Sequence, residues 1–77
     1  MINAKIVGAG GYGGVGITEL ILRHPHVNIG CLVSLSDTGR LMSDVYPHLK
    51  GKCDIKIVSP DHDIVTNKYD VVIYSTP

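Results

Sequence analysis

Apolar residues form four short runs that predict β-strands, over residues 4–7, 27–33, 55–58 and 70–74. The first run leads directly into a dense glycine stretch, which is typical of a buried strand that ends in a tight turn. Every odd-numbered position of 27–33 is apolar, so we expect one wholly apolar face, with Cys31 on it. The run 70–74 is apolar on both faces, as a central parallel strand should be.

The residues between the first two strands predict a helix. Ile17, Leu20 and Ile21 recur at helical spacing within residues 14–24, and Pro25 ends the pattern. Strand, helix and strand then occupy about thirty residues, the size of a βαβ unit, whose strands are parallel and whose connection is right-handed. We therefore expect an α/β fold.

The second half of the chain contains a long connection and a second helix start. Residues 34–54 exceed the ~12–15 residues of ordinary loops, so we expect a functional loop with a helical turn at 41–45. Ser59 is followed by a proline, an arrangement that resembles a helix start and predicts a short helix over 60–67.

Composition narrows the classes of function. The 77 residues include seven Lys or Arg and seven Asp or Glu, so the formal net charge is zero. A nucleic-acid partner is not expected, because a protein that binds the phosphate backbone needs excess positive charge. No run approaches the ~20 apolar residues of a membrane span, and no signal peptide precedes the first strand. We expect a cytoplasmic protein that binds neither nucleic acid nor membrane.

The cysteines and histidines lack the spacing of a metal site or a catalytic pair. His24 and His26 flank a proline, and no third ligand is evident. Cys31 fits a buried thiol, whereas two lysines near Cys53 favour a lowered thiol pKa. Because neither cysteine has a recognisable general base, we assign no catalytic residue and no metal ligand.

The glycine stretch carries the most informative chemistry. Gly8, Gly10 and Gly13 form G-x-G-x-x-G, and Gly8, Gly11 and Gly14 form G-x-x-G-x-x-G. Between a strand and a helix, this spacing favours a dinucleotide diphosphate on the helix N-terminus, with a purely structural glycine turn as the alternative. The expected cofactor-binding loop is Gly8, Ala9, Gly10, Gly11, Tyr12, Gly13 and Gly14.

The end of the second strand favours NADP(H) over NAD(H). An NAD-specific site usually places an acid there for the ribose 2′-hydroxyl, and this chain has Ser34. Ser36 can donate a hydroxyl, and the guanidinium of Arg40 suits a 2′-phosphate. Two alternatives stay open: a shift of the strand end would bring Asp37 to the ribose, and Arg40 could be an ordinary solvated cation.

Three segments resemble the N-acetyl-gamma-glutamyl-phosphate reductase family. They are IVGAGGYGG at 6–14, RHP at 23–25 and GRLMSDVYPHLKG at 39–51. The third is the most specific, because many dehydrogenases share the glycine loop. The resemblance spans nearly the whole chain.

This resemblance implies NADPH-dependent reduction of an acyl phosphate to a semialdehyde in arginine biosynthesis, through a thioester on a cysteine. That cysteine and its partner histidine belong to later parts of the family's sequence. Residues 1–77 are then the N-terminal portion of an NADP-binding domain, the first half of a Rossmann-type parallel sheet. The catalytic domain lies outside the chain, so we expect this portion alone to be inactive and the full-length protein to be a homo-oligomer.

The resemblance also bears on individual positions. The glycine loop, Ser34, Ser36 and Arg40 match cofactor-side positions of the family, and the resemblance places Thr76 and Pro77 near the nucleotide. The chain departs from the family at two glycines. Gly10 stands where Thr or Ser is common, which removes a loop hydrogen bond, and Gly16 stands where Glu is common, which weakens the helix.

Two alternatives remain. An aspartate-semialdehyde-dehydrogenase type of enzyme would share the glycine loop but is not expected to share residues 39–51. A non-catalytic module that senses a dinucleotide would bind the same cofactor without turnover. Sequence beyond this chain discriminates them, because the reductase needs a downstream cysteine and histidine.

Overall fold

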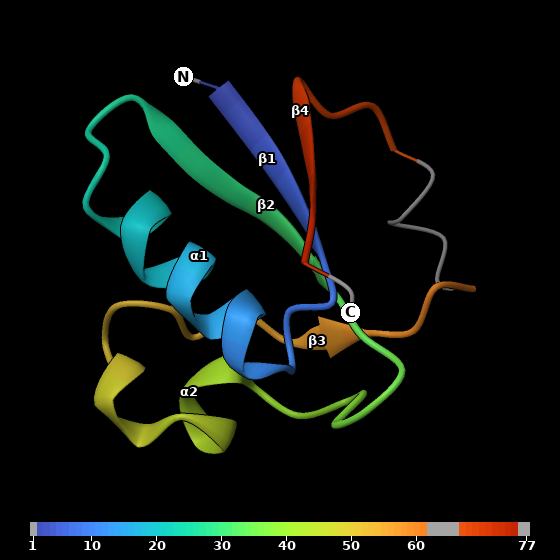
Figure 1. Ribbon diagram of the computed structural model, residues 1–77. Coiled ribbons are helices and arrows are strands. Elements are labelled where there is room, and N and C mark those ends of the chain that lie inside the picture. Colours follow the sequence, from blue (N-terminus) through green and yellow to red (C-terminus); the bar gives the residue numbers. More distant parts are fainter. Residues whose placement is uncertain (1, 62–66, 76–77) are drawn as a thin grey trace.

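The fold is a four-stranded parallel sheet with helices packed on it (Figure 1). Its strands are β1 (Ile2–Val7), β2 (Val27–Val33), β3 (Ile57–Val58) and β4 (Val71–Tyr74). They lie in the order β3-β2-β1-β4, and every pairing is parallel. The chain steps from β1 outward to β3 and then returns to the other side of β1, as in the predicted first half of a Rossmann-type sheet.

The computed structural model describes residues 2–61 and 67–75. The helix predicted over 60–67 therefore lies mostly outside the described residues, at 62–66, and the same holds for Thr76 and Pro77. Within the described part, no helix is long and apolar enough to cross a bilayer.

Helix α1 (Tyr12–Leu22) begins and ends two residues before the predicted 14–24. At its end the amides of Arg23 and His24 donate to carbonyls three residues back, at 3.2 and 2.9 Å. This tightened turn satisfies carbonyls that an α-helical end leaves open, and the proline that follows cannot continue the helix.

The long connection holds a short helix α2 (Met42–Val45) and a 3-10 helix η1 (Pro47–Leu49), so the predicted helical turn at 41–45 is confirmed. Figure 1 shows α2 beside the N-terminal end of α1. Strand β3 is shorter than the predicted 55–58, because the backbone at residues 55 and 56 binds the chain around α2 instead: the Met42 amide donates to the carbonyl of residue 55 at 2.8 Å.

The core lies between the sheet and the helices. Side chains of α1 pack against a buried cluster to which β1, β2, β3 and the long connection all contribute. Its members are Ile6, Ala9, Ile29, Leu32, Met42, Leu49, Cys53 and Ile57. The sheet and the long connection therefore both bury their apolar residues on the face of the sheet that α1 covers.

A β-bulge at Gly30 corrects the predicted face of β2. Ala4 pairs with Ile29 and Lys5 with Cys31, so Gly30 is an extra residue without a partner on β1. One inserted residue exchanges the two faces of a strand. Ile29 therefore shares the core side with residue 32, and Cys31 lies on the other face. The prediction of a single apolar face through every odd position is wrong.

The neighbourhood of the bulge explains the glycine. A Cβ on Gly30 would lie 2.8 Å from the ring of Tyr69. That ring packs on the sheet face where Cys31 is buried, and Lys5 lies over it with its ammonium 5.6 Å from the ring centre. A larger residue at the bulge would displace the tyrosine.

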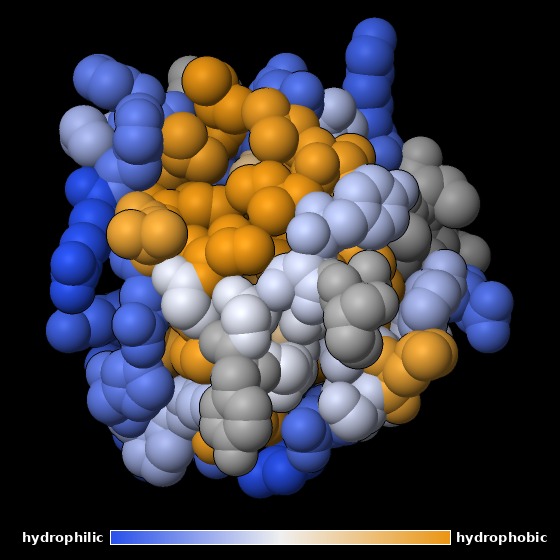
Figure 2. All heavy atoms as spheres, in the orientation of Figure 1, coloured by the Kyte–Doolittle hydropathy of each residue, from blue (hydrophilic) through white to orange (hydrophobic). Residues whose placement is uncertain are grey.

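Among the described residues β4 pairs with β1 on one side only, so its predicted central position stays a prediction. No strand in the described residues pairs with its outer side, and Val71 is 41% and Tyr74 70% exposed. Figure 2 shows apolar side chains gathered on this face of the molecule, and the exposed Ile2 belongs to β1, the strand that pairs with β4. The apolar character of β4 is thus not used for burial among the described residues.

Candidate functional site

The glycine loop is fixed to the end of β2 by its own backbone. The amides of Gly8 and Ala9 both donate to the carbonyl of Val33, at 2.8 and 3.0 Å. Gly8 has φ of 89°, a left-handed conformation that a side chain disfavours. The loop therefore starts its turn at the carboxyl end of the sheet, beside the last residue of β2.

Gly14 lets α1 approach the loop closely. A Cβ on this residue would lie 2.2 Å from the Gly8 carbonyl oxygen and 2.7 Å from the Ala9 Cα, both backbone atoms that cannot rotate away. One turn later, the buried Thr18 hydroxyl donates to the Gly14 carbonyl at 2.8 Å. The close helix–strand packing that the motif predicts for Gly14 is present.

The start of α1 presents backbone N–H groups. Gly11 is the N-cap and offers no side-chain acceptor to them. The amides of the first helical turn, at Tyr12, Gly13 and Gly14, have no acceptor within a helix, and the helix dipole is positive there. An anion can occupy this place without a side chain in its way at Gly11 or Gly13, which are both exposed.

A hollow of about 460 Å³ opens beside this helix start, where the carboxyl ends of β1, β2 and β4 converge. It is lined by Val7, Gly8, Gly11, Val33, Ser34, Leu35, Ser36, Pro60 and Ser75. Its volume is within the ~300–1,000 Å³ typical of small-molecule sites. It also lies where the strand order reverses around β1, the usual place for ligands in open α/β sheets.

A second hollow, of about 500 Å³, lies between α1 and η1. Its charged groups are mixed, since Glu19 pairs with His48 at 2.6 Å, and Arg23 and Lys52 lie on the same lining. It lies at the carboxyl-terminal part of α1, where the helix dipole is negative and does not favour an anion. We therefore place the candidate cofactor site at the glycine loop.

Two serine hydroxyls lie against the glycine loop at the end of β2. The Ser34 side chain accepts from the Ser36 amide at 3.2 Å, and the two hydroxyl oxygens are 3.3 Å apart. A Cβ on Gly10 would lie 2.8 Å from Ser34 Oγ and 3.1 Å from Ser36 Oγ. The absence of a side chain at Gly10 thus leaves room for the serine pair, and the structure brings both predicted residues to the loop.

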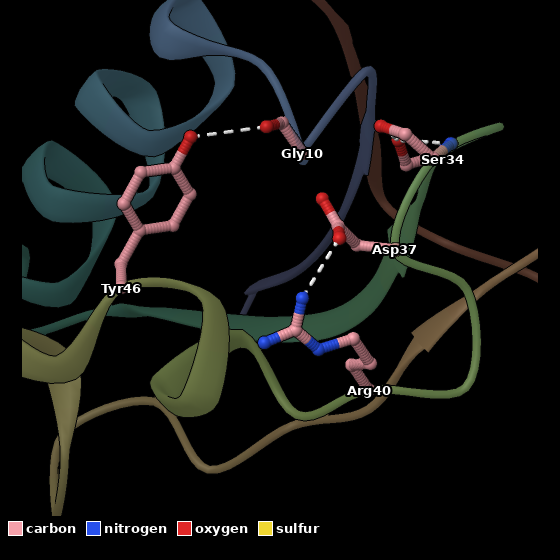
Figure 3. Close-up of polar contacts among 6 residues, drawn as sticks. Gly10, Ser34, Asp37, Arg40 and Tyr46 are labelled. Carbon is pink, nitrogen blue, oxygen red and sulfur yellow. Dashed lines mark hydrogen bonds and ion pairs between the residues drawn. The ribbon is translucent and has the colours of Figure 1, made fainter.

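Arg40 forms an ion pair with Asp37, the residue that the sequence offered as an alternative contact to the ribose. Its guanidinium donates to Asp37 Oδ1 at 3.0 Å (Figure 3), and the Arg40 side chain is 55% exposed. Asp37 has φ of 58°, which turns the chain so that the two side chains meet. Asp37 and Arg40 therefore lie together next to the end of β2, and neither makes a described hydrogen bond to Ser34 or Ser36.

Two residues of this site, Ser75 and Tyr46, were not predicted from the sequence. Ser75 lines the hollow, donates its amide to the Val7 carbonyl at 2.8 Å, and places Oγ where a Cβ on Gly13 would be 2.6 Å away. The sequence feature that could have identified Ser75 is its place as a small polar residue directly after the last strand. The hydroxyl of Tyr46 donates to the Gly10 carbonyl at 3.0 Å, a contact between distant parts of the sequence that no local pattern announces.

None of the described cysteines and histidines lines the hollow at the glycine loop. No group of three or more possible metal ligands occurs in the described residues. Burial raises the pKa of the Cys53 thiol, with a smaller contribution from the charge of Asp54, against a backbone hydrogen bond that lowers it. The expectation that nearby lysines lower this pKa is wrong, because desolvation dominates.

The parallel sheet, the glycine turn between β1 and α1, and the hollow at the strand ends together define the first half of a dinucleotide-binding domain of the Rossmann type. Comparison with protein families gives the more particular assignment. The family described as semialdehyde dehydrogenase, NAD binding domain, matches residues 3–77, and the chain belongs to this family.

Curated relatives named N-acetyl-gamma-glutamyl-phosphate reductase match the chain along its length. The one from Acaryochloris marina is 46% identical over 76 residues, which are 99% of this chain and 22% of the relative. The one from Aromatoleum aromaticum is 38% identical over 77 residues, which are 100% of this chain and 22% of the relative. The predicted resemblance is confirmed, and the chain spans 22% of the length of these relatives.

Among solved structures, aspartate semialdehyde dehydrogenase with NADP from Candida albicans superimposes on the whole chain. The TM-score is 0.79 and the identity 23%, and the match covers 100% of this chain and 24% of that protein. An aspartate-semialdehyde-dehydrogenase type of enzyme was the alternative to the reductase in the sequence analysis. At this identity the match shows the shared fold.

Proposed function

We propose that the chain is the NADPH-binding, N-terminal part of a reductase that converts N-acetyl-gamma-glutamyl phosphate to its semialdehyde in arginine biosynthesis. The observation that carries the proposal is the serine pair Ser34 and Ser36, seated against the glycine loop at the end of β2. An NAD-specific site has an acid at the position of Ser34. The names of the relatives that match along nearly all of this chain support the choice of substrate.

The glycine loop holds the cofactor diphosphate in this proposal. The amides at the start of α1 donate to the phosphate oxygens, and the helix dipole adds a favourable field. Gly11 and Gly13 keep side chains out of the path, and Gly14 keeps the helix close enough for its amides to reach. The bound cofactor supplies the hydride for reduction.

The ribose 2′-phosphate is held at the other end of the hollow. Ser34 and Ser36 donate hydroxyl hydrogen bonds, and Arg40 supplies the positive charge. The ion pair with Asp37 does not prevent this, because an exposed pair contributes only about 0–1 kcal/mol and a phosphate is a stronger partner. Asp37 keeps the guanidinium near the end of β2 until the phosphate arrives.

The remaining predictions concern the whole protein. Thr76 and Pro77 stay predicted cofactor contacts, and the catalytic cysteine and histidine stay predicted outside residues 1–77. The inactivity of this portion alone, the homo-oligomeric state and the cytoplasmic location also stay predictions. Assay of the isolated chain, size-exclusion chromatography and cell fractionation test them in turn.

The test is calorimetric titration of the full-length gene product with NADPH and with NADH. Arg40→Ala should weaken NADPH by about 10- to 100-fold, the effect of losing a hydrogen bond to a charged group, and should change NADH by less than about twofold. The matched control is Arg23→Ala, which removes a cation at the opposite end of α1 and should change neither affinity.

The outcomes separate the parts of the proposal. Equal losses of NADPH and NADH affinity in Arg40→Ala would remove the 2′-phosphate role of this residue. Absence of binding to either dinucleotide would overturn the proposal at its base. Binding without reduction of the acyl phosphate by the full-length protein would favour the non-catalytic sensing module.

A further inference from the structure

The Gly10 carbonyl is held by a residue from a distant part of the chain. The hydroxyl of Tyr46, 36 residues later in the sequence, donates to this oxygen at 3.0 Å. Figure 3 shows the carbonyl directed at Tyr46, with Ser34 on the opposite side of the loop. The long connection that carries α2 therefore reaches back and contacts the middle of the glycine loop.

Tyr46 is itself well fixed. It follows α2 directly, its amide donates to the Met42 carbonyl at 2.9 Å, and its half-buried ring packs against the core cluster. The ring meets that of His48 edge-on at 6.2 Å, and His48 pairs with Glu19 of α1. The hydroxyl thus comes from a frame that is attached both to the core and to the helix whose start forms the site.

The direction of this carbonyl determines the shape of the loop. A trans peptide is planar, so a Gly10 oxygen that points to Tyr46 directs the Gly11 N–H the opposite way. That N–H donates to the Gly8 carbonyl at 3.2 Å and closes the turn that leads into α1. Both polar groups of the Gly10–Gly11 peptide are therefore satisfied in one orientation.

The opposite orientation would harm anion binding. If the peptide turned over, the Gly10 oxygen would take the place of the Gly11 N–H and face the Gly8 carbonyl, at the edge of the hollow that Gly8 and Gly11 line. A carbonyl oxygen at this edge carries partial negative charge and would repel a diphosphate bound in the hollow. Glycine on both sides of this peptide leaves such a rotation unhindered by side chains, so it is opposed by the two hydrogen bonds, Gly11 N–H to the Gly8 carbonyl and Tyr46 hydroxyl to the Gly10 carbonyl.

We propose that Tyr46 is a positioning residue for dinucleotide binding: its hydroxyl holds the Gly10–Gly11 peptide with the carbonyl turned away from the diphosphate. This inference rests on the proposed function of the glycine loop. It assigns to the segment between β2 and β3 a role in shaping the cofactor site, in addition to its place in the core.

The test uses Tyr46→Phe in the full-length gene product, which removes the hydroxyl and keeps the ring. Calorimetric titration with NADPH should show about tenfold weaker binding, as expected when a half-buried carbonyl loses its partner. Adenosine 2′-monophosphate, which has the 2′-phosphate but no diphosphate, should bind within about twofold of the unchanged protein, because Ser34 and Ser36 are unaltered.

The matched control is Tyr69→Phe, the same chemical change on the other face of the sheet, which should leave NADPH affinity unchanged. Circular dichroism establishes that each variant is folded.

Three outcomes would overturn the inference, and they are distinguishable. Unchanged NADPH affinity in Tyr46→Phe, with normal binding by the unaltered protein, removes the role of the hydroxyl and leaves the proposed function intact. Equal weakening of NADPH and adenosine 2′-monophosphate indicates general loosening of the site rather than positioning of one peptide. Failure of the unaltered protein to bind NADPH overturns the proposed function and this inference together.

Discussion

Gly14 and Gly16 lie two residues apart in α1 and should respond oppositely to the same substitution. A Cβ on Gly14 would lie 2.2 Å from the Gly8 carbonyl oxygen, whereas a Cβ on Gly16 meets nothing within 4 Å. Ordinary contact requires more than 3 Å, so Gly14→Ala forces the helix start away from the loop by about 1 Å. The atoms in the way are backbone atoms, and no side-chain rotation relieves the clash.

The magnitudes follow from two opposing effects. Alanine in place of glycine inside a helix contributes about 0.5–1 kcal/mol of stability, which is all that Gly16→Ala should show. Overpacking at Gly14 should cost about 2–3 kcal/mol against that gain. For a domain of ordinary size this is a fall of roughly 5–10 °C in the unfolding midpoint, compared with a rise of about 2–3 °C for Gly16→Ala.

The assay is differential scanning calorimetry of both variants of the full-length product, followed by titration with NADPH. Gly14→Ala should also lose at least tenfold in NADPH affinity, because the amides of the first turn move with the helix. Gly16→Ala should bind as the unchanged protein does. If Gly14→Ala melted at or above the unchanged protein, the close approach of α1 to the loop would not exist and the reasoning would fail.

Three further predictions concern smaller perturbations. Gly10→Ser should barely lower the unfolding midpoint, because the atom it meets is the movable Ser34 hydroxyl, yet it should weaken NADPH about tenfold by displacing that hydroxyl; a titration with unchanged affinity would contradict this. The Cys53 thiol, whose pKa is raised from 9.0 by burial, should resist alkylation by iodoacetamide at pH 8 until urea unfolds the chain, as peptide mass mapping would reveal. Since the folded thiol stays neutral to higher pH than the unfolded one, the fold should lose stability as pH rises above about 9.

The sequence predicted the elements whose signals are local. Periodic apolar residues indicated α1. The glycine loop was predicted because two of its glycines meet requirements of the immediate turn, the positive φ of Gly8 and the close approach at Gly14. The serines after β2 followed from the length of a single βαβ unit. These features depend on neighbours within about thirty residues, the length of one βαβ unit.

What the sequence could not predict depends on partners far along the chain. The bulge at Gly30 is a property of the pairing between β1 and β2, and the spacing within β2 alone gives no sign of it. The contact from Tyr46 to Gly10 requires the path of the whole long connection.

One carbonyl, that of Val33, accepts the amides of both Gly8 and Ala9 and so couples two recognition elements mechanically. The glycine turn and the serines proposed for the ribose 2′-phosphate are thereby tied together, since Ser34 is the next residue after that shared acceptor. If the proposed function holds, this part of the site is already formed before the nucleotide binds, and ordering it costs little conformational entropy. Discrimination between the two coenzymes would then depend on a preorganised site, in which movement of the glycine turn does not compensate for a missing or misplaced phosphate at the serines.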